Sequence, residues 1–236
     1  AGRFDGPEKE AIRQHLASLP ISEGTADIRN VEVVRRSVDA LLDAGEVDRA
    51  EVWLEAWGAK VRDRRIPDWA RWEIEARQRV RLARKRFDEA ANEALPAWAT
   101  GDVDARHTND FFRGVAMLHV DPPRSDDAAK VFQELLREAP QQPAYAVNLF
   151  AARTQKLTNS LGDREPTSEE EDSLRDLLLF GETLLSRFAA EQRAQVEQTY
   201  QVNRLYLFNR LRDWPALLSA FQSLPPPLQK HPELAS

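Results

Sequence analysis

The 236-residue sequence predicts an all-α protein built from stacked antiparallel helix hairpins. Alanine, leucine, glutamate and arginine are abundant and only 9 glycines are present, a composition that favours helix over strand. Apolar residues recur at helical spacing in several segments. A small residue also recurs at an equivalent place about every 39 residues, which is typical of a helical repeat.

The clearest hairpin lies in residues 33–57, where two apolar stripes flank a glycine. The first stripe comprises Val34, Val38, Leu41 and Leu42, and the second comprises Ala50, Leu54 and Trp57. Gly45 is expected to end the first helix, because glycine readily takes the positive φ that follows many helix C-termini. We expect Asp48 to cap the second helix, with Glu51 completing a capping box.

The small residue of the second stripe sets the register of the repeats. Its first occurrences, Ala11, Ala50, Ala90 and Ala128, are separated by 39, 40 and 38 residues. Gly181 follows after 53 residues and Leu217 after a further 36. A small side chain lets two helices approach closely, and larger apolar residues fill the groove between hairpins. The register predicts a half-repeat at 6–20 and hairpins at 28–61, 67–99, 106–139, 142–189 and 191–224.

The longest interval between repeats contains a polar segment, residues 157–172, with Gly162 and Pro166. We expect a surface loop here, followed by a helix that Ser168 caps together with Glu171. A loop of this length is either a tolerated insertion or a functional element.

One segment, DDAAKVFQELLREAP, places a small residue before two large apolar residues and a proline. The four positions are Ala128, Phe132, Leu135 and Pro140. In this pattern the chain resembles the tetratricopeptide repeat family. The resemblance implies one right-handed α-solenoid of about 11 helices spanning residues 1–236. Arginine outnumbers lysine 27 to 6, as in many proteins of GC-rich bacteria, and both ends look like cuts through a repeat array. We therefore expect degenerate repeats from a longer bacterial protein.

The resemblance also implies a binding surface. In that family, the first helices of the hairpins line a concave groove that binds a partner protein or peptide. The corresponding residues here are Arg35, Asp39, Arg79, Arg113, Asn148, Asn203 and Tyr206. Asn148 and Asn203 match positions at which the family's peptide-carboxylate clamps carry asparagine, but the matching lysines are missing. The resemblance therefore favours an internal peptide or a folded partner over an acidic C-terminal tail.

A basic run in residues 76–87 suggests an alternative function. Arg77, Arg81 and Arg84 fall on one helical face and could bind nucleic acid or an anionic polymer. A solvated helix face balanced by nearby carboxylates is the other interpretation, and a net charge of −6 does not favour a general nucleic-acid binder. The clustered tryptophans Trp53, Trp57, Trp69 and Trp72 are expected to pack between successive hairpins.

Signals of catalysis are missing from the sequence. There is no cysteine, no two of the 4 histidines have metal-ligand spacing, and no phosphate-binding glycine loop or nucleophile motif occurs. No apolar run has the length of a membrane span. We expect a non-enzymatic interaction scaffold without a cofactor or metal, acting through the concave face or the 157–172 loop. A bacterial secretion or export assembly is one setting, and the sequence leaves periplasm and cytoplasm open.

Overall fold

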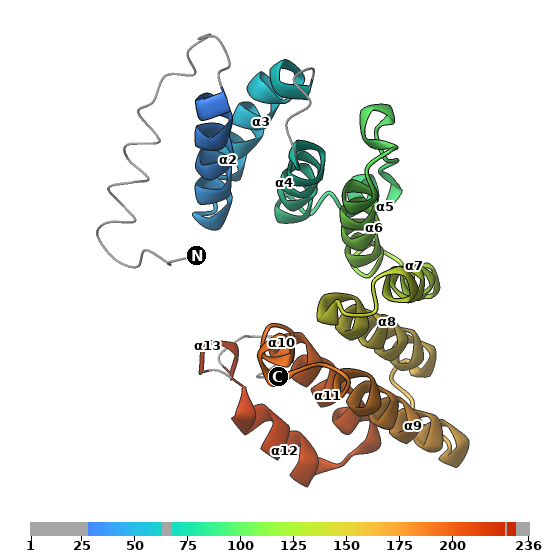
Figure 1. The fold of residues 1–236 in the computed structure, drawn as a ribbon. Helices are drawn as coiled ribbons and strands as arrows, with labels where there is room; N and C mark the ends of the chain where they lie inside the picture. The colour runs from blue at the N-terminus through green and yellow to red at the C-terminus, as the bar shows by residue number, and fades with distance from the viewer. Residues whose placement is uncertain (1–27, 63–67, 225, 230–236) are drawn as a thin grey trace. The chain divides into compact units, whose positions relative to one another are not determined.

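The computed structural model describes residues 28–62, 68–224 and 226–229. Every regular element in this part of the chain is a helix, which confirms the all-α class (Figure 1). The half-repeat predicted at 6–20, including Ala11, lies outside the described residues. The chain divides into two compact units, an N-terminal unit of residues 1–116 and a C-terminal unit of residues 117–236.

Among the described residues, the N-terminal unit contains six helices. They are α2 (Ile28–Asp43), α3 (Val47–Arg62), α4 (Trp69–Ala83), α5 (Phe87–Asn92), the short 3₁₀ helix η1 (Ala97–Ala99) and α6 (Val103–Met117). Helix α3 packs against both α2 and α4, and α2 also contacts α4 directly. The core contains the buried tryptophans Trp53, Trp57 and Trp69, with Trp72 packed at its edge. The tryptophans therefore pack between helices, as predicted.

The turn between α2 and α3 shows how a hairpin is closed. Gly45 has a φ of 77°, which confirms the expected helix-ending glycine. Its N–H donates to the Leu42 carbonyl, and the Glu46 N–H donates to the Leu41 carbonyl. This pair of bonds is the Schellman motif, which satisfies carbonyls at the end of a helix.

Two later turns repeat this motif without glycine. Lys85 follows α4 with a φ of 57°, and Arg212 follows α11 (Glu197–Leu211) with a φ of 55°. Arg86 and Asp213, the next residues, donate their N–H groups to the carbonyls five residues earlier, as Glu46 does. The three turns thus share one backbone conformation, although only the first has a glycine at the position with positive φ.

The first turn of α3 differs from the prediction. The helix begins at Val47, so Asp48 lies inside its first turn and is not the cap. Asp48 and Glu51 instead accept ion pairs from Arg84 at the end of α4, at 2.5 and 2.6 Å. The capping-box prediction was wrong because these carboxylates pair with the following repeat.

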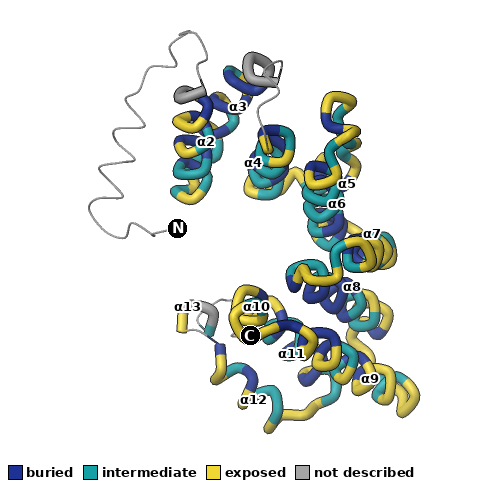
Figure 2. The backbone as a smooth tube through the Cα atoms, viewed as in Figure 1, coloured by how far each residue is buried: buried dark blue, intermediate teal, exposed yellow. Residues whose placement is uncertain are grey.

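Helix α8 is the centre of the C-terminal unit. The unit consists of α7 (Ser125–Glu138), α8 (Pro143–Leu161), α9 (Ser168–Leu185), α10 (Ala190–Ala194), α11, α12 (Trp214–Ser223) and α13 (Pro226–Gln229). Helix α8 contacts α7, α9 and α11, and nine of its 19 residues are buried. The dark blue stretches of α8 in Figure 2 mark these residues. Helix α11 also packs against α9 and α12.

The small positions of the register lie at close helix contacts. Ala50, Ala90 and Ala128 are each 0% exposed. A Cβ atom at Gly181 would lie 2.7 Å from the Phe150 ring of α8, so only glycine allows this approach of α9. Leu217 is half-buried at its position in α12.

The predicted 157–172 loop is much shorter than expected. Helix α8 continues to Leu161, which is 2% exposed and packs in the core, so only residues 162–167 are non-helical. Helix α9 is capped by Thr167 with Glu170, one residue before the predicted pair. The loop prediction was wrong because residues 158–160 are polar and interrupt the apolar pattern in the sequence, although α8 and its buried side continue to Leu161.

Candidate partner-binding surfaces

Three of the predicted groove residues meet in the N-terminal unit. Trp72 Nε1 donates to both carboxylate oxygens of Asp39 at 3.3 Å. Arg79 donates to Asp39 at 3.4 Å and to Asp43 at 2.7 Å. The Arg35 guanidinium lies 5.9 Å from the centre of the Trp72 ring, within range of a cation–π contact. These residues tie α2 to α4.

Burial and its charged neighbours act in opposite directions on the carboxyl group of Asp39. Burial raises its pKa above the ordinary 3.8, while the Trp72 hydrogen bond and the charges of Arg79 and Arg35 act in the opposite direction. Asp39 thus bonds two residues of α4, Trp72 and Arg79.

Arg113, the remaining predicted residue of this unit, lies on α6. Its Nε donates to the Ala91 carbonyl at 3.4 Å, and its NH1 group donates to Asp110 at 3.0 Å. Arg113 therefore links α6 to α5 and lies outside the Asp39 cluster.

The three arginines proposed for anion binding are each paired with carboxylates. Arg77 pairs at 2.9 Å with Glu73, a fully buried residue that also accepts a bond from Trp69. Arg81 pairs with Glu93 at 3.1 Å, just after α5. With Arg84 bound to α3, the basic run joins neighbouring elements within the unit. The sequence held one signal of this: Arg79–Asp43 and Arg84–Asp48 are both separated by 36 residues.

The C-terminal unit places Asn148 on α8 and Asn203 on α11, two helices that pack together. Each side-chain amide donates to the carbonyl four residues earlier in its own helix, Ala144 or Thr199, at 2.8 Å. Neither Oδ1 atom accepts a hydrogen bond from the described part of the chain. Tyr206, three residues after Asn203, is 46% exposed. We call these three predicted residues the first-helix face.

Two ion pairs anchor the middle of the loop of residues 162–167. Arg164 pairs with Glu170 of α9, and Glu165 pairs with Arg212 at 2.5 Å. The Arg164 hydrogen bond, supported by the Thr167 backbone, lowers the pKa of Glu170 from 4.5 to about 2. The predicted loop site is therefore a short, anchored turn.

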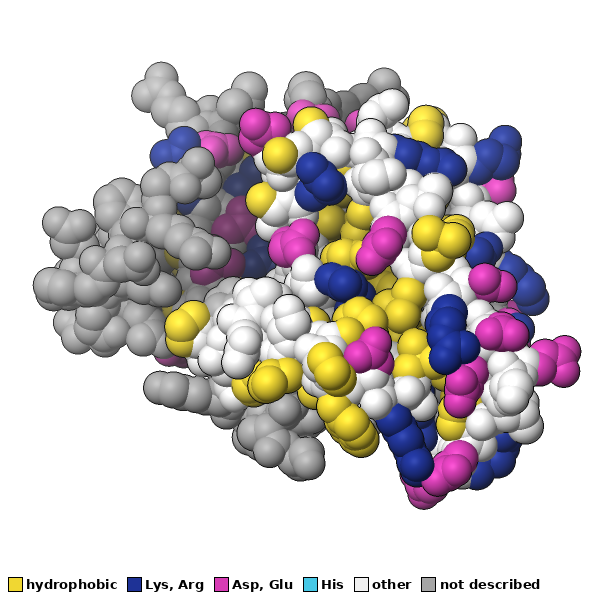
Figure 3. Space-filling view, turned by 90° about the horizontal axis from the view of Figure 1, so that it is seen from below, with side chains coloured by type: hydrophobic (Ala, Val, Ile, Leu, Met, Phe, Trp, Pro, Cys, Tyr) yellow, Lys and Arg dark blue, Asp and Glu magenta, His cyan; other side chains and the backbone are white. Residues whose placement is uncertain are grey.

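Figure 3 shows basic and acidic side chains interspersed on the face that it displays, with exposed hydrophobic side chains between them. Within the described ranges, no helix has the length and apolar composition needed to cross a membrane, in agreement with the prediction.

Comparisons with family models, with curated proteins and with solved structures found no match for this chain. The tetratricopeptide resemblance therefore rests on the repeat register and its motif residues.

Proposed function

We propose that the chain is a non-catalytic scaffold that binds an extended segment of a partner protein on the first-helix face. The pair of asparagine oxygens without a bonding partner among the described residues, on packed helices α8 and α11, carries this proposal. Their NH₂ groups are tied to the helices, so both amides are held in place before a partner arrives. Preorganised acceptors reduce the entropy that binding must overcome.

The usual spacing of two packed helices is compatible with a peptide main chain. Packed helix axes lie about 8–10 Å apart. In an extended chain, the N–H groups that point to one side recur every second residue, roughly 7 Å apart. Asn148 and Asn203 could therefore accept hydrogen bonds from one extended segment. Tyr206 adds an exposed aromatic group of the kind that dominates many interfaces.

No observation favours the alternative of nucleic-acid binding. Arg77, Arg81 and Arg84 each bond a carboxylate, and a phosphate would have to displace those partners. We therefore propose a protein partner.

A displayed library of random linear peptides, selected on the full chain, tests the proposal. Each hydrogen bond between neutral groups contributes about 1 kcal/mol, so we expect the Asn148→Ala/Asn203→Ala variant to bind the selected peptides roughly tenfold or more weakly. Tyr206→Ala should weaken them at least fivefold, about 1 kcal/mol. Asn159→Ala, an exposed asparagine on α8, is the matched control. Equal binding by wild type and the double variant would refute the proposed surface.

A further inference from the structure

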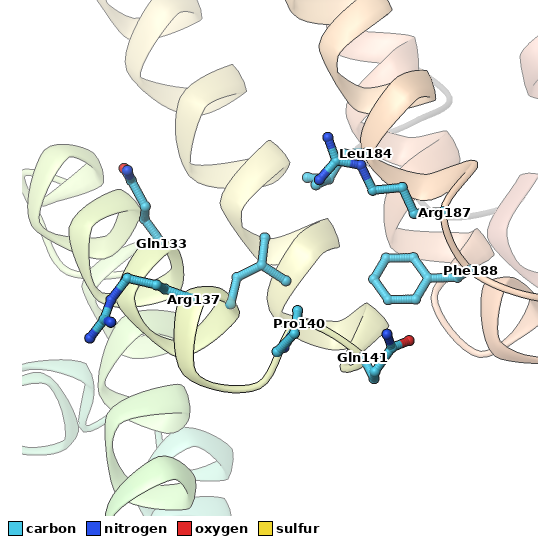
Figure 4. Close-up of a pocket in the computed structure, with 8 residues that line it drawn as sticks. Gln133, Arg137, Pro140, Gln141, Leu184, Arg187 and Phe188 are labelled. Carbon is cyan, nitrogen blue, oxygen red and sulfur yellow. The ribbon is translucent and has the colours of Figure 1, made fainter.

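The C-terminal unit contains a second concave feature, a pocket of about 340 Å³ between α7 and α9 (Figure 4). Its floor is apolar and comprises Leu136, Pro140, Leu184 and Phe188. Leu184 and Phe188 are only 5% exposed and belong to the core around α8, and Leu136 packs against that core. The floor is thus fixed by the fold, and its volume is at the lower end of the range for ligand pockets.

The rim of the pocket is polar, and its two arginines differ. Arg137 is already paired with Glu134 at 2.5 Å and with Glu138 at 3.9 Å. Arg187 is exposed and forms no ion pair or hydrogen bond through its side chain with the described residues. An exposed guanidinium beside an apolar floor favours a partner group that combines a carboxylate with an apolar side chain.

Two glutamines complete the rim. Gln133 and Gln141 lie at opposite edges of the pocket in Figure 4, one on α7 and one in the turn before α8. Their amides bond to nothing else in the described part of the chain. A side-chain amide both donates and accepts, so the pair could bond main-chain groups on both sides of a bound residue. That arrangement suits a chain that continues in both directions.

We propose that the pocket between α7 and α9 docks an internal, extended segment of a partner protein that carries a large apolar side chain next to an acidic residue. The apolar side chain enters the floor, the carboxylate accepts from Arg187, and the glutamines bond the adjoining main chain. This site shares no residue with the first-helix face, and its partner has a different chemistry.

Acetylated and amidated short peptides that hold one leucine beside one glutamate are the probe. We expect saturable shifts in the backbone amide resonances of Leu136, Leu184 and Phe188 when these peptides are added to the full chain. Peptides with glutamine in place of glutamate should bind on the order of tenfold more weakly, because a charge-assisted bond to Arg187 is lost. No shift at the pocket, or equal binding of both peptides, would overturn the proposal.

Charge reversal at the rim gives the matched protein experiment. Arg187→Glu should weaken the glutamate peptide on the order of tenfold or more and should restore binding of a peptide with lysine in its place. Arg193→Glu is the control, because Arg193 is also exposed and without a side-chain bond to the described residues. Equal weakening by both variants would indicate a general charge effect and contradict a specific site.

Other occupants give distinct results. Tighter binding by a peptide that ends in leucine with a free carboxylate would assign the pocket to a C-terminal tail and overturn the internal segment. Concentration-dependent dimerisation in sedimentation, abolished by Arg187→Glu, would assign it to a second copy. The Asn148→Ala/Asn203→Ala variant should bind the glutamate peptide as wild type does. The proposals for this pocket and for the first-helix face can therefore be refuted separately.

Discussion

Asp39 and Arg79 in the N-terminal unit bond each other across α2 and α4, whereas Asn148 and Asn203 in the C-terminal unit bond only their own helices. All four occupy positions that the repeat register assigns to the first helix of a hairpin. In the N-terminal unit these positions hold helices together. In the C-terminal unit their side-chain oxygens accept no hydrogen bond from the described residues. An equivalent position in the repeat register thus predicts where a residue lies on its helix. Whether that residue bonds a neighbouring helix depends on the side chains that the neighbouring helix offers.

The first prediction concerns the packing that holds α8 and its open face in place. Gly181→Ala would bring a Cβ atom to 2.7 Å from the Phe150 ring, so we expect a loss of about 2 kcal/mol in the stability of the C-terminal unit. Urea unfolding with site-resolved hydrogen exchange measures the loss and locates it.

Two further variants sharpen that test. Gly101→Ala has no heavy atom within 4 Å of the added Cβ and should be close to neutral. Phe150→Leu should relieve the clash. The double variant Gly181→Ala/Phe150→Leu should therefore lose less stability than the sum of the losses of the two single variants. Additive losses would mean that this contact does not limit the approach of α9.

The second prediction compares the two kinds of surface directly. Asp39→Ala removes the acceptor of Trp72 and one partner of Arg79, so it should cost the N-terminal unit about 1–2 kcal/mol. Asn148→Ala removes a bond within one helix and should cost less than about 0.5 kcal/mol. Denaturant unfolding of both variants measures these losses. Similar losses in the two variants would contradict the distinction between the Asp39 contact and the first-helix face.

The third prediction concerns the turns that the two units share. Lys85 and Arg212 adopt the left-handed conformation that Gly45 adopts without a side-chain penalty. Lys85→Gly should stabilise the chain by about 0.5–1 kcal/mol, and Gly45→Ala should destabilise it by about 1 kcal/mol. Arg212→Gly should stabilise the chain less than Lys85→Gly, because it also removes the ion pair with Glu165. Thermal unfolding provides the measurement. A loss of stability in Lys85→Gly would mean that its side chain contributes more than its backbone costs.

Much of the helical fold could be predicted from the sequence, because burial and close packing restrict the residue types at a position. Ala50, Ala90 and Ala128 are 0% exposed, and the space beside Gly181 is filled by an aromatic ring, so the small residues of the register lie at close helix contacts. Gly45 was recognised because glycine favours positive φ. Lys85 and Arg212 were missed, since nothing in their side chains indicates that conformation.

The candidate sites were predicted less completely. The register selected Asn148, Asn203 and Tyr206, but whether their polar atoms are free depends on tertiary neighbours. In the sequence, Arg77 and Arg84 have the spacing of a cationic helix face. In the structure, Glu73 pairs with Arg77 and Asp48 pairs with Arg84. The pocket near Arg187 arises from two segments about 50 residues apart, and no local pattern joins them.

The smallest expected effect is a difference in pH dependence between two carboxyl groups. The folded-state pKa of Glu170 is lowered from 4.5 to about 2, chiefly by its bond with Arg164. Its contribution to stability is therefore fully present above pH 4.5 and is lost as the pH falls towards 2. The pKa of Asp39 is instead raised above 3.8, chiefly by burial, so its charged form is disfavoured in the folded state and its contribution falls as the pH rises above 3.8.

Single amide substitutions separate the two signs. The stability difference between wild type and Glu170→Gln, from urea unfolding followed by circular dichroism, should shrink as the pH falls from 4.5 to 2, with Glu169→Gln as the control. For Asp39→Asn, tryptophan fluorescence follows urea unfolding. The stability of wild type relative to this variant should rise as the pH falls, because only wild type has a charge whose burial is costly. If both differences change in the same direction, burial does not dominate the pKa of Asp39, and its ion pair with Arg79 contributes more to the contact between α2 and α4 than burial costs.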